Sequence, residues 1–163
     1  MDNTFDFLCD IILHVGEVQE NIEEFTSELK KRGLAHDRTK FLALEFDAFV
    51  STREDFKRAN YGSEEYKRCV DEAHGAVVHH HENNRHHTHY HKNGIDDMNM
   101  IDIIEMVCDW KAASRRSPDM DFAGSIDHAF KKYGVGKQLG RILKNTFEQL
   151  GWIKPGEPTT AKI

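Results

Sequence analysis

Histidines crowd into one short stretch of this sequence, HHHENNRHHTHYH at residues 79–91. The chain has 11 histidines, and 8 of them fall within the 18 positions from His74 to His91. Neutral imidazole nitrogens are good ligands for borderline divalent metal ions. The run is internal, is interrupted and precedes an apolar segment, so it does not read as a purification tag. Three interpretations stay open: a metal site, a loose metal-sequestering tract, and a solvated polar stretch without chemistry.

Four residues outside this run could supply further ligands. His14 lies on an apolar helical stripe and should face inward, while His36 and Asp37 form the single His-Asp dipeptide of the chain. Asp109 lies in EMVCDWKAA, an amphipathic segment, where a charged side chain is costly unless it is paired or binds a metal. Taken alone, His14 is more often a hydrogen-bonded core histidine than a ligand, Asp37 at a helix start is a routine cap, and Asp109 could form an ion pair. The order H…HD…D therefore carries more weight than any single residue.

The elements that would position these side chains are helices. Apolar residues recur at helical spacing, and no segment shows the alternation of a strand. We expect helices over residues 4–32, 37–50, 63–84, 100–116, 122–133 and 137–150. Ser63 and Asn99 are the expected N-caps, and Gly33 is expected to end the first helix. The sequence predicts an all-α fold, a compact bundle of six or seven helices. One domain should cover residues 1–152, and a mobile tail should follow over 153–163.

Composition narrows the protein class. Hydrophobic residues make up 39% and charged residues 31% of the 163 positions, the balance of a globular domain. A formal net charge of -6 argues against broad nucleic-acid binding and against binding to anionic membranes. The three cysteines show no CxxC pair and are typical of reduced thiols. The start MDNTFDFLCDIILHVGEV is not typical of a signal peptide, and its apolar run is too short and too charged to span a bilayer. We expect a cytoplasmic protein without a membrane segment; whether it forms a homo-oligomer stays open.

The order His14, His36-Asp37 and Asp109 on an all-α chain resembles the HD-domain superfamily of metal-dependent phosphohydrolases, over roughly residues 8 to 116. The resemblance implies an HD-like bundle in which these four residues ligate a first divalent ion. Some members of the superfamily bind a second ion through extra histidines between the HD pair and the last aspartate. That implies metal ligation by three members of the run, with Asp37 bridging both ions: His80, His86 and His87.

A second resemblance is more specific. The segments HDRTKFLALEF, HHHENNRHH and GIDDMNMIDIIEMVCDWKAA are similar to a family of small, largely uncharacterised phage and bacterial proteins. Those proteins share HDxxK, HHxxNNxHH and CDWK segments. This resemblance implies a bacterial cytosol as the setting, with phage origin left open. Neither resemblance distinguishes Mn, Fe, Zn, Co, Ni and Mg, or one ion from two.

Several residues near the ligands are candidates for roles in catalysis. Asp37 should help to orient a water molecule, and Glu45 should act as a general acid or support a ligand. Lys40, one turn beyond His36, is expected to neutralise a substrate phosphate. His80, Asn84 and His87 follow the spacing i, i+4, i+7 and would share one face of a helix that continues through them. The expected substrate contacts are Lys40, Asn84, Lys111 and Arg115.

The implied chemistry is hydrolysis by metal-activated water. We expect a phosphomonoesterase or phosphodiesterase that uses one or two divalent ions and acts on a nucleotide or nucleotide-like substrate. An alternative is a catalytically silent nucleotide- or metal-binding module, for example a phage protein that sequesters a host nucleotide signal. A further alternative is a structural metal-binding protein, from which removal of the metal would unfold the chain.

Overall fold

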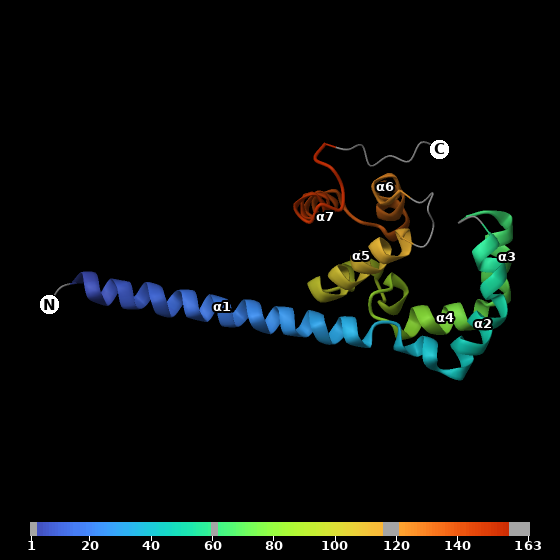
Figure 1. The fold of residues 1–163 in the computed structure, drawn as a ribbon, viewed down its shortest axis with the longest axis horizontal. Coiled ribbons are helices and arrows are strands. Elements are labelled where there is room, and N and C mark those ends of the chain that lie inside the picture. Colours follow the sequence, from blue (N-terminus) through green and yellow to red (C-terminus); the bar gives the residue numbers. More distant parts are fainter. Residues whose placement is uncertain (1–2, 60–61, 116–120, 157–163) are drawn as a thin grey trace. The chain divides into compact units, whose positions relative to one another are not determined.

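The computed structural model describes residues 3–59, 62–115 and 121–156. Within these ranges the regular structure is helical throughout, with seven α-helices, three short 3-10 helices and no strand (Figure 1). The predicted all-α fold with six or seven helices is thereby confirmed. None of the helices in the described ranges is long and apolar enough to cross a membrane.

The chain divides into two compact units, Met1–His36 and Asp37–Ile163, and each is described by itself. The single domain expected over residues 1–152 stays a prediction. Most of the expected tail, residues 157–163, lies outside the described residues.

The first unit consists of one long helix, α1 (Asn3–Ala35). Asp6 lies in its first turn and Arg32 in its last turn, so each charge interacts favourably with the helix dipole. The expected stop at Gly33 is wrong, because Gly33 is not among the glycines with positive φ and the helix continues to Ala35. A helix usually ends at glycine when that residue takes the left-handed conformation.

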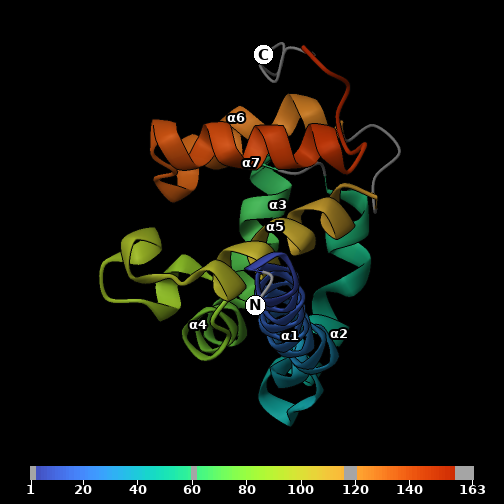
Figure 2. The same cartoon turned by 90° about the vertical axis from the view of Figure 1, so that its left-hand side faces the viewer.

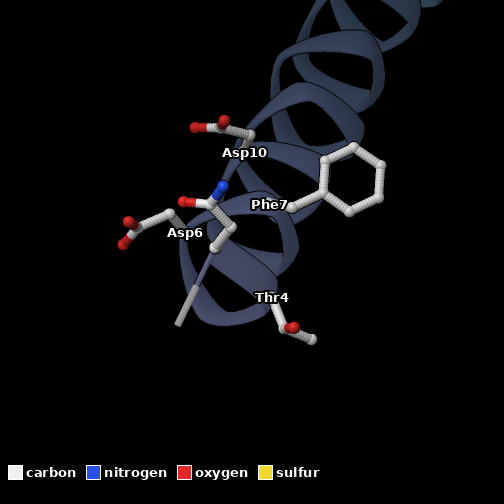
Figure 3. A pocket seen from close by; sticks show the side chains of 5 residues that line it. Thr4, Asp6, Phe7 and Asp10 are labelled. Carbon is white, nitrogen blue, oxygen red and sulfur yellow. The ribbon is translucent and has the colours of Figure 1, made fainter. Parts of the chain in front are cut away.

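A shallow hollow lies on the first turns of α1 (Figure 3). Its labelled side chains are Thr4, Asp6, Phe7 and Asp10, and Phe7 points away from both carboxylates. All of them project from a single helix, so they do not converge on a common point. The hollow is not a candidate site.

The second unit begins with the elements that carry the histidine run. These are η1 (Arg38–Phe41), α2 (Ala43–Arg58), α3 (Glu64–Glu72) and α4 (His74–Asn83). The helix predicted to start at Asp37 instead begins at Ala43, after the short η1. Ser63 is the expected N-cap, and its hydroxyl accepts a hydrogen bond from the Tyr66 backbone N–H at 3.1 Å. The single helix predicted over 63–84 is in fact two helices, which meet at Ala73.

The rest of the second unit supplies the apolar core. It contains η2 (Thr88–Tyr90), η3 (Gly94–Asp97), α5 (Met100–Ser114), α6 (Phe122–Tyr133) and α7 (Lys137–Gln149). Asn99 caps α5 as predicted, and Gly134, with φ 72°, ends α6. Helices α6 and α7 lie side by side in both views (Figures 1 and 2). Side chains of α5, α6 and α7 and their flanking residues form the core: Met98, Ile103, Met106, Val107, Phe122, Ala123, Ile126, Phe130, Leu143, Phe147 and Ile153.

Candidate metal centre

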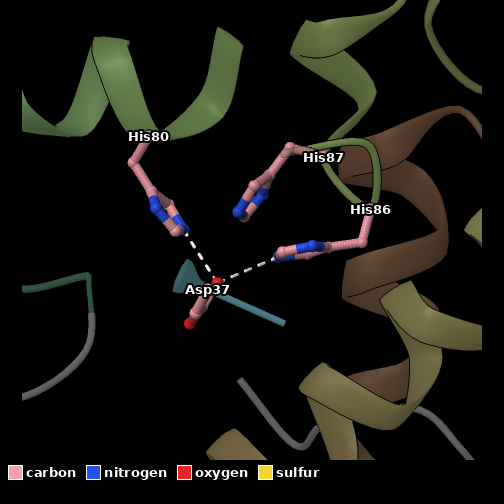
Figure 4. A group of neighbouring side chains, drawn as sticks. All are labelled: Asp37, His80, His86 and His87. Atoms are coloured by element: carbon pink, nitrogen blue, oxygen red, sulfur yellow. Dashed lines mark ion pairs between the residues drawn. The ribbon is translucent and has the colours of Figure 1, made fainter. Parts of the chain in front are cut away.

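Four side chains of the second unit converge on one point (Figure 4). Asp37, His80, His86 and His87 each offer one ligand atom, and these atoms all lie within 4.8 Å of one another. Oδ1 of Asp37 is 3.2 Å from Nε2 of His80 and 3.5 Å from Nε2 of His86. The aspartate precedes η1, His80 belongs to α4, and the other two histidines follow α4 in the chain. The fold therefore gathers ligands from segments more than forty residues apart.

The backbone at Asp37 aims its carboxylate at the histidines. With φ 55° and ψ 22°, Asp37 is the one non-glycine residue of the described ranges in the left-handed region. Its side chain makes no capping hydrogen bond to η1, so the helix-cap interpretation of this aspartate does not apply. Aspartate tolerates this conformation better than most residues, yet it still costs on the order of 1 kcal/mol. Strain of this kind is common where a side chain must be held in place for function.

His80 is held by a buried carboxylate. Its Nδ1 lies 2.9 Å from Oε2 of Glu45, a residue with no exposed surface. Oε2 of Glu45 also accepts a hydrogen bond from the Thr39 hydroxyl at 3.0 Å, and Oε1 lies 2.6 Å from Nδ1 of His79. A carboxylate acts only as an acceptor, so the imidazole must donate through Nδ1. The Nε2 atom of His80 then carries a lone pair, and it faces Asp37.

His86 repeats this arrangement with a second carboxylate. Its Nδ1 lies 3.2 Å from Oε1 of Glu105 on α5, and its Nε2 faces Asp37. The side chain of His86 is 2% exposed and that of Glu105 is 9% exposed. Histidines that ligate metals usually donate their other ring N–H to a carboxylate or carbonyl, which fixes the tautomer and the ring orientation. Two of the three imidazoles here are oriented in that way.

His87 completes the group as a neutral base. Burial, together with the neighbouring His86, His81 and His80, lowers the pKa of His87 to about 2. Its Nε2 is buried and has no hydrogen-bond partner among the residues that the structure describes. An unsatisfied buried nitrogen costs roughly 1–3 kcal/mol. A ligand at the centre of the group would remove that cost.

The donor set fits a divalent cation. Protonating the rings instead would place positive charges close together, since the ring centroid of His87 is 4.8 Å from that of His80 and 4.1 Å from that of His86. If the rings are neutral, the lone pairs of their nitrogens face the Asp37 carboxylate, and the lone pairs and the carboxylate repel each other unless a cation lies between them. Two ligand atoms that each lie about 2.0–2.2 Å from an ion are roughly 3.0–3.5 Å from each other. The distances from Oδ1 of Asp37 to Nε2 of His80 and of His86, 3.2 and 3.5 Å, agree with this. Three imidazoles and one carboxylate favour Zn, Mn, Fe, Co or Ni over Mg.

The segment that carries His86 and His87 is fixed to α5 by an ion pair. Arg85 Nε and Nη2 donate to Oδ1 and Oδ2 of Asp102 at 3.0 and 2.8 Å. Asp102 has no exposed surface and also accepts a hydrogen bond from the Asn99 backbone N–H, which closes the capping box of α5. His91 donates from Nε2 to the Arg85 carbonyl at 2.9 Å. The two candidate ligands next to Arg85, His86 and His87, are thus held by contacts outside the candidate metal centre.

Replacing this arginine should destabilise the fold. We expect Arg85→Ala to lower the free energy of unfolding by about 3 kcal/mol, because it leaves the Asp102 carboxylate buried without its cation. Urea unfolding followed by circular dichroism measures the change. The matched control is Arg68→Ala, which removes an exposed partner 3.6 Å from Glu65 and should cost less than about 1 kcal/mol. Equal effects of the two variants would contradict a role for Arg85 in holding the loop.

Lys40 and Asn84 both lie beside the centre. Lys40 Nζ pairs with Oδ2 of Asp37, the oxygen that does not face the histidines. The buried Asn84 amide donates to the Thr39 hydroxyl and to the His80 carbonyl, each at 2.7 Å, so it joins η1 to α4. The predicted common helix face is wrong, because α4 ends at Asn83 and Asn84 is extended. His80 and His87 meet instead through a turn, in which the His87 N–H donates to the Asn84 carbonyl at 3.0 Å.

The remaining predicted site residues are not part of this group. Lys111 Nζ donates to the Trp152 carbonyl at 3.4 Å and lies 4.5 Å from the centre of the Phe122 ring, so it packs against the core. Arg115 is exposed and follows the last residue of α5. Asp109 lies one turn of α5 beyond Glu105 and is not among the four converging ligands.

The other two predicted ligands belong to the first unit. His14 lies on α1, and His36 ends the unit directly before Asp37. Metal ligation by His14, His36 and Asp109 stays a prediction. Glu105 and Thr39 are the functional candidates that the sequence interpretation missed. Glu105 stands one helical turn from Asp109 in EMVCDWKAA, and that spacing was the available signal.

Comparison with known proteins gives one match. A family profile described as "Family of unknown function (DUF5662)" covers residues 3–150 of the chain. Neither the curated proteins nor the solved structures gave a match.

Proposed function

The chain belongs to DUF5662, a family of unknown function, and from this premise we propose that it is a metal-dependent phosphohydrolase acting on a nucleotide or nucleotide-like substrate. The observation that carries the proposal is the convergence of Asp37, His80, His86 and His87, with a carboxylate behind two of the imidazoles. The resemblance to HD-domain enzymes supports the same reaction class.

The chemistry follows from these ligands. Asp37, His80, His86 and His87 would hold a divalent ion, which would lower the pKa of a water molecule from about 16 towards 7 and polarise a phosphoryl oxygen. Oδ1 of Asp37 faces the histidines, and Oδ2 pairs with the ammonium group of Lys40. The Asp37 carboxylate therefore connects the group of candidate ligands to Lys40. Asp37 would help to orient a water molecule there.

Lys40 is the candidate phosphate contact. Its side chain is 37% exposed, so an anionic substrate can reach the ammonium group from solvent. A phosphate oxygen would compete with Oδ2 of Asp37 for the Lys40 N–H donors. Glu45 is assigned a positioning role rather than that of a general acid, because both of its oxygens already contact donors from Thr39, His79 and His80.

A nucleotide is favoured over a simple phosphate ester by an aromatic surface next to the centre. The rings of His81 and His89 are stacked, with centroids 4.6 Å apart and an interplanar angle of 10°, and His81 lies 4.4 Å from His87. Burial, together with the nearby His89 and His80, lowers the pKa of His81 to about 4, so this ring is neutral near pH 7. Nucleobases stack on such rings, at roughly 1–3 kcal/mol per base.

We place this activity in the cytoplasm. The cysteines Cys9, Cys69 and Cys108 are free thiols, which is typical of proteins in a reducing compartment. Whether a bacterium or a phage encodes the protein does not alter the chemistry.

A nucleotide panel tests the function. The protein is reconstituted separately with Mn, Fe, Co, Ni, Zn and Mg and incubated with mono-, di-, tri- and cyclic nucleotides. We expect release of phosphate or opening of a phosphodiester with at least one metal, and none after chelation. Tight nucleotide binding without consumption would instead indicate a silent binding module. Unfolding on chelation, with neither binding nor turnover, would indicate a structural metal site.

A further inference from the structure

Seven apolar residues of α1 follow a heptad repeat. Between residues 8 and 29 they recur at alternating spacings of three and four, which is the pattern of the a and d positions of a coiled coil, and the exposed Ile12 and Leu13 lie outside it. We define the a/d stripe as the four a residues and three d residues of this repeat: Leu8, Val15, Ile22 and Leu29 at a, and Ile11, Val18 and Phe25 at d. No polar residue interrupts the stripe.

The a/d stripe is not covered within its own unit. The exposed fractions of its side chains run from 41% at Val18 to 59% at Ile22, and Leu29 alone is partly buried. The unit has no second described element that could cover them, because α1 spans Asn3–Ala35. Most of the stability of a protein helix comes from packing an apolar face, and a contiguous exposed stripe marks an interaction surface.

The charges of α1 indicate which partner fits. The e and g positions beside the stripe hold one formal charge, at Glu28, and that carboxylate pairs with Lys31 of the same helix at 3.2 Å. The acidic residues lie at the outer b, c and f positions: Asp10, Glu17, Glu20, Glu23 and Glu24. Charges at e and g set partner choice in coiled coils, and equal charges there would repel an identical helix. The near-neutral flanks of this stripe suit a second copy of the same helix, not a charged partner.

We propose that two copies of this chain pair through the a/d stripe of α1 as a homodimeric coiled coil. The helix has 33 residues and is about 50 Å long, so each copy can contribute three heptads to the coiled coil. Two such stripes facing each other bury roughly 1,000–1,500 Å² in total, which overlaps the lower part of the range of about 1,200–2,000 Å² for specific interfaces. The contact is isologous, so it closes at two copies and does not propagate into a filament. It does not depend on the metal centre, which lies in the second unit of each copy.

Sedimentation equilibrium of the full chain tests the dimer. We expect the wild type at twice the 18.9 kDa of one chain at micromolar concentration. Ile22→Glu places a charge in the middle of the stripe and should raise the dissociation constant at least about 100-fold. The matched control Ser27→Glu adds the same charge at an outer f position of the same helix and should remain dimeric.

Two results would overturn the proposal. A wild type that sediments at 18.9 kDa up to about 100 μM would mean that the stripe is covered within one chain or by a different protein. An Ile22→Glu variant as dimeric as Ser27→Glu would mean that the two copies associate elsewhere. If Ile22→Glu fails to fold, judged by circular dichroism and metal content, Ile22→Asn replaces it. Asparagine is tolerated at single a positions, so this variant should fold and still dissociate about 10-fold more readily.

Discussion

Asp37→Asn protein is expected to bind a divalent metal at least about 100-fold more weakly than the wild type and to lose nucleotide hydrolysis. The substitution keeps the size of the side chain and removes the negative charge that lies 3.2 Å from His80 and 3.5 Å from His86. It also keeps the backbone, because asparagine accepts the left-handed conformation that Asp37 adopts with φ 55°. Asp37→Ala would be less informative, since alanine adds strain at this position to the loss of the ligand.

Isothermal titration of metal-free protein and elemental analysis after dialysis measure the loss. Asp71→Asn is the matched control: it makes the same change on the exposed surface of α3 and should retain full metal content. Thermal unfolding of metal-free Asp71→Asn should match the wild type within about 0.5 kcal/mol, and a cooperative unfolding transition of metal-free Asp37→Asn shows that this variant folds. If Asp37→Asn kept the metal and the activity, the carboxylate would not be a ligand and the proposed function would lose its main support.

The ligand types of the site were accessible from the sequence, whereas their convergence was not. The histidine run and the His-Asp dipeptide are visible as letters, and the resemblance to HD-domain enzymes selected His80, His86 and His87 from the run. The physical device that brings them together is the turn after α4, where Asn84 is extended and the His87 N–H bonds to its carbonyl. The common face considered for His80, Asn84 and His87 required a helix that continues beyond residue 84, and α4 ends at Asn83. A polar segment rich in histidine contains neither proline nor glycine to mark the break.

The supporting carboxylates show a different limit. Glu45 was singled out, but the choice between a general acid and a support for a ligand stayed open, and Glu105 was passed over in favour of Asp109. The oxygens of the buried Glu45 carboxylate contact the Thr39 hydroxyl and the His79 ring, and both of these residues belong to other elements of the fold. The sequence does not show which oxygen of such a carboxylate already has a hydrogen-bond donor. Periodicity assigns a residue to a helix face; it does not assign hydrogen-bond partners across the fold.

Helix type and caps were the most predictable part of the fold. α6 has the predicted bounds, and Ser63 and Asn99 cap their helices, because periodicity and capping are local. The break at Leu42 has no glycine or proline beside it, and the glycine nearest to Ala73 is Gly75, which lies inside α4. Packing between helices determines where these two breaks lie, and local helix propensity is too weak to predict their positions.

Glu45→Gln should separate a positioning role from a catalytic one. An amide presents an N–H₂ group to one of the two imidazole N–H donors at 2.6 and 2.9 Å, so His79 or His80 loses its acceptor. His80 then becomes free to turn or to change tautomer, and the lone pair of Nε2 no longer points reliably at the centre. Loss of such a supporting partner typically lowers metal affinity by about 10–100-fold. We expect that drop for Glu45→Gln, with hydrolysis recovering when the metal concentration is raised.

The pH profile distinguishes the two roles. A general acid would leave metal affinity unchanged, and its removal would abolish one limb of the pH dependence of kcat even at saturating metal. Removal of a positioning residue would leave the shape of the pH profile of kcat unchanged and would raise only the metal concentration that is needed for full activity. Glu82→Gln on the exposed side of α4 is the matched control and should alter neither quantity. A Glu45→Gln enzyme with normal metal affinity and a missing limb would restore the catalytic role, because the carboxylate would then have to leave His80 during turnover.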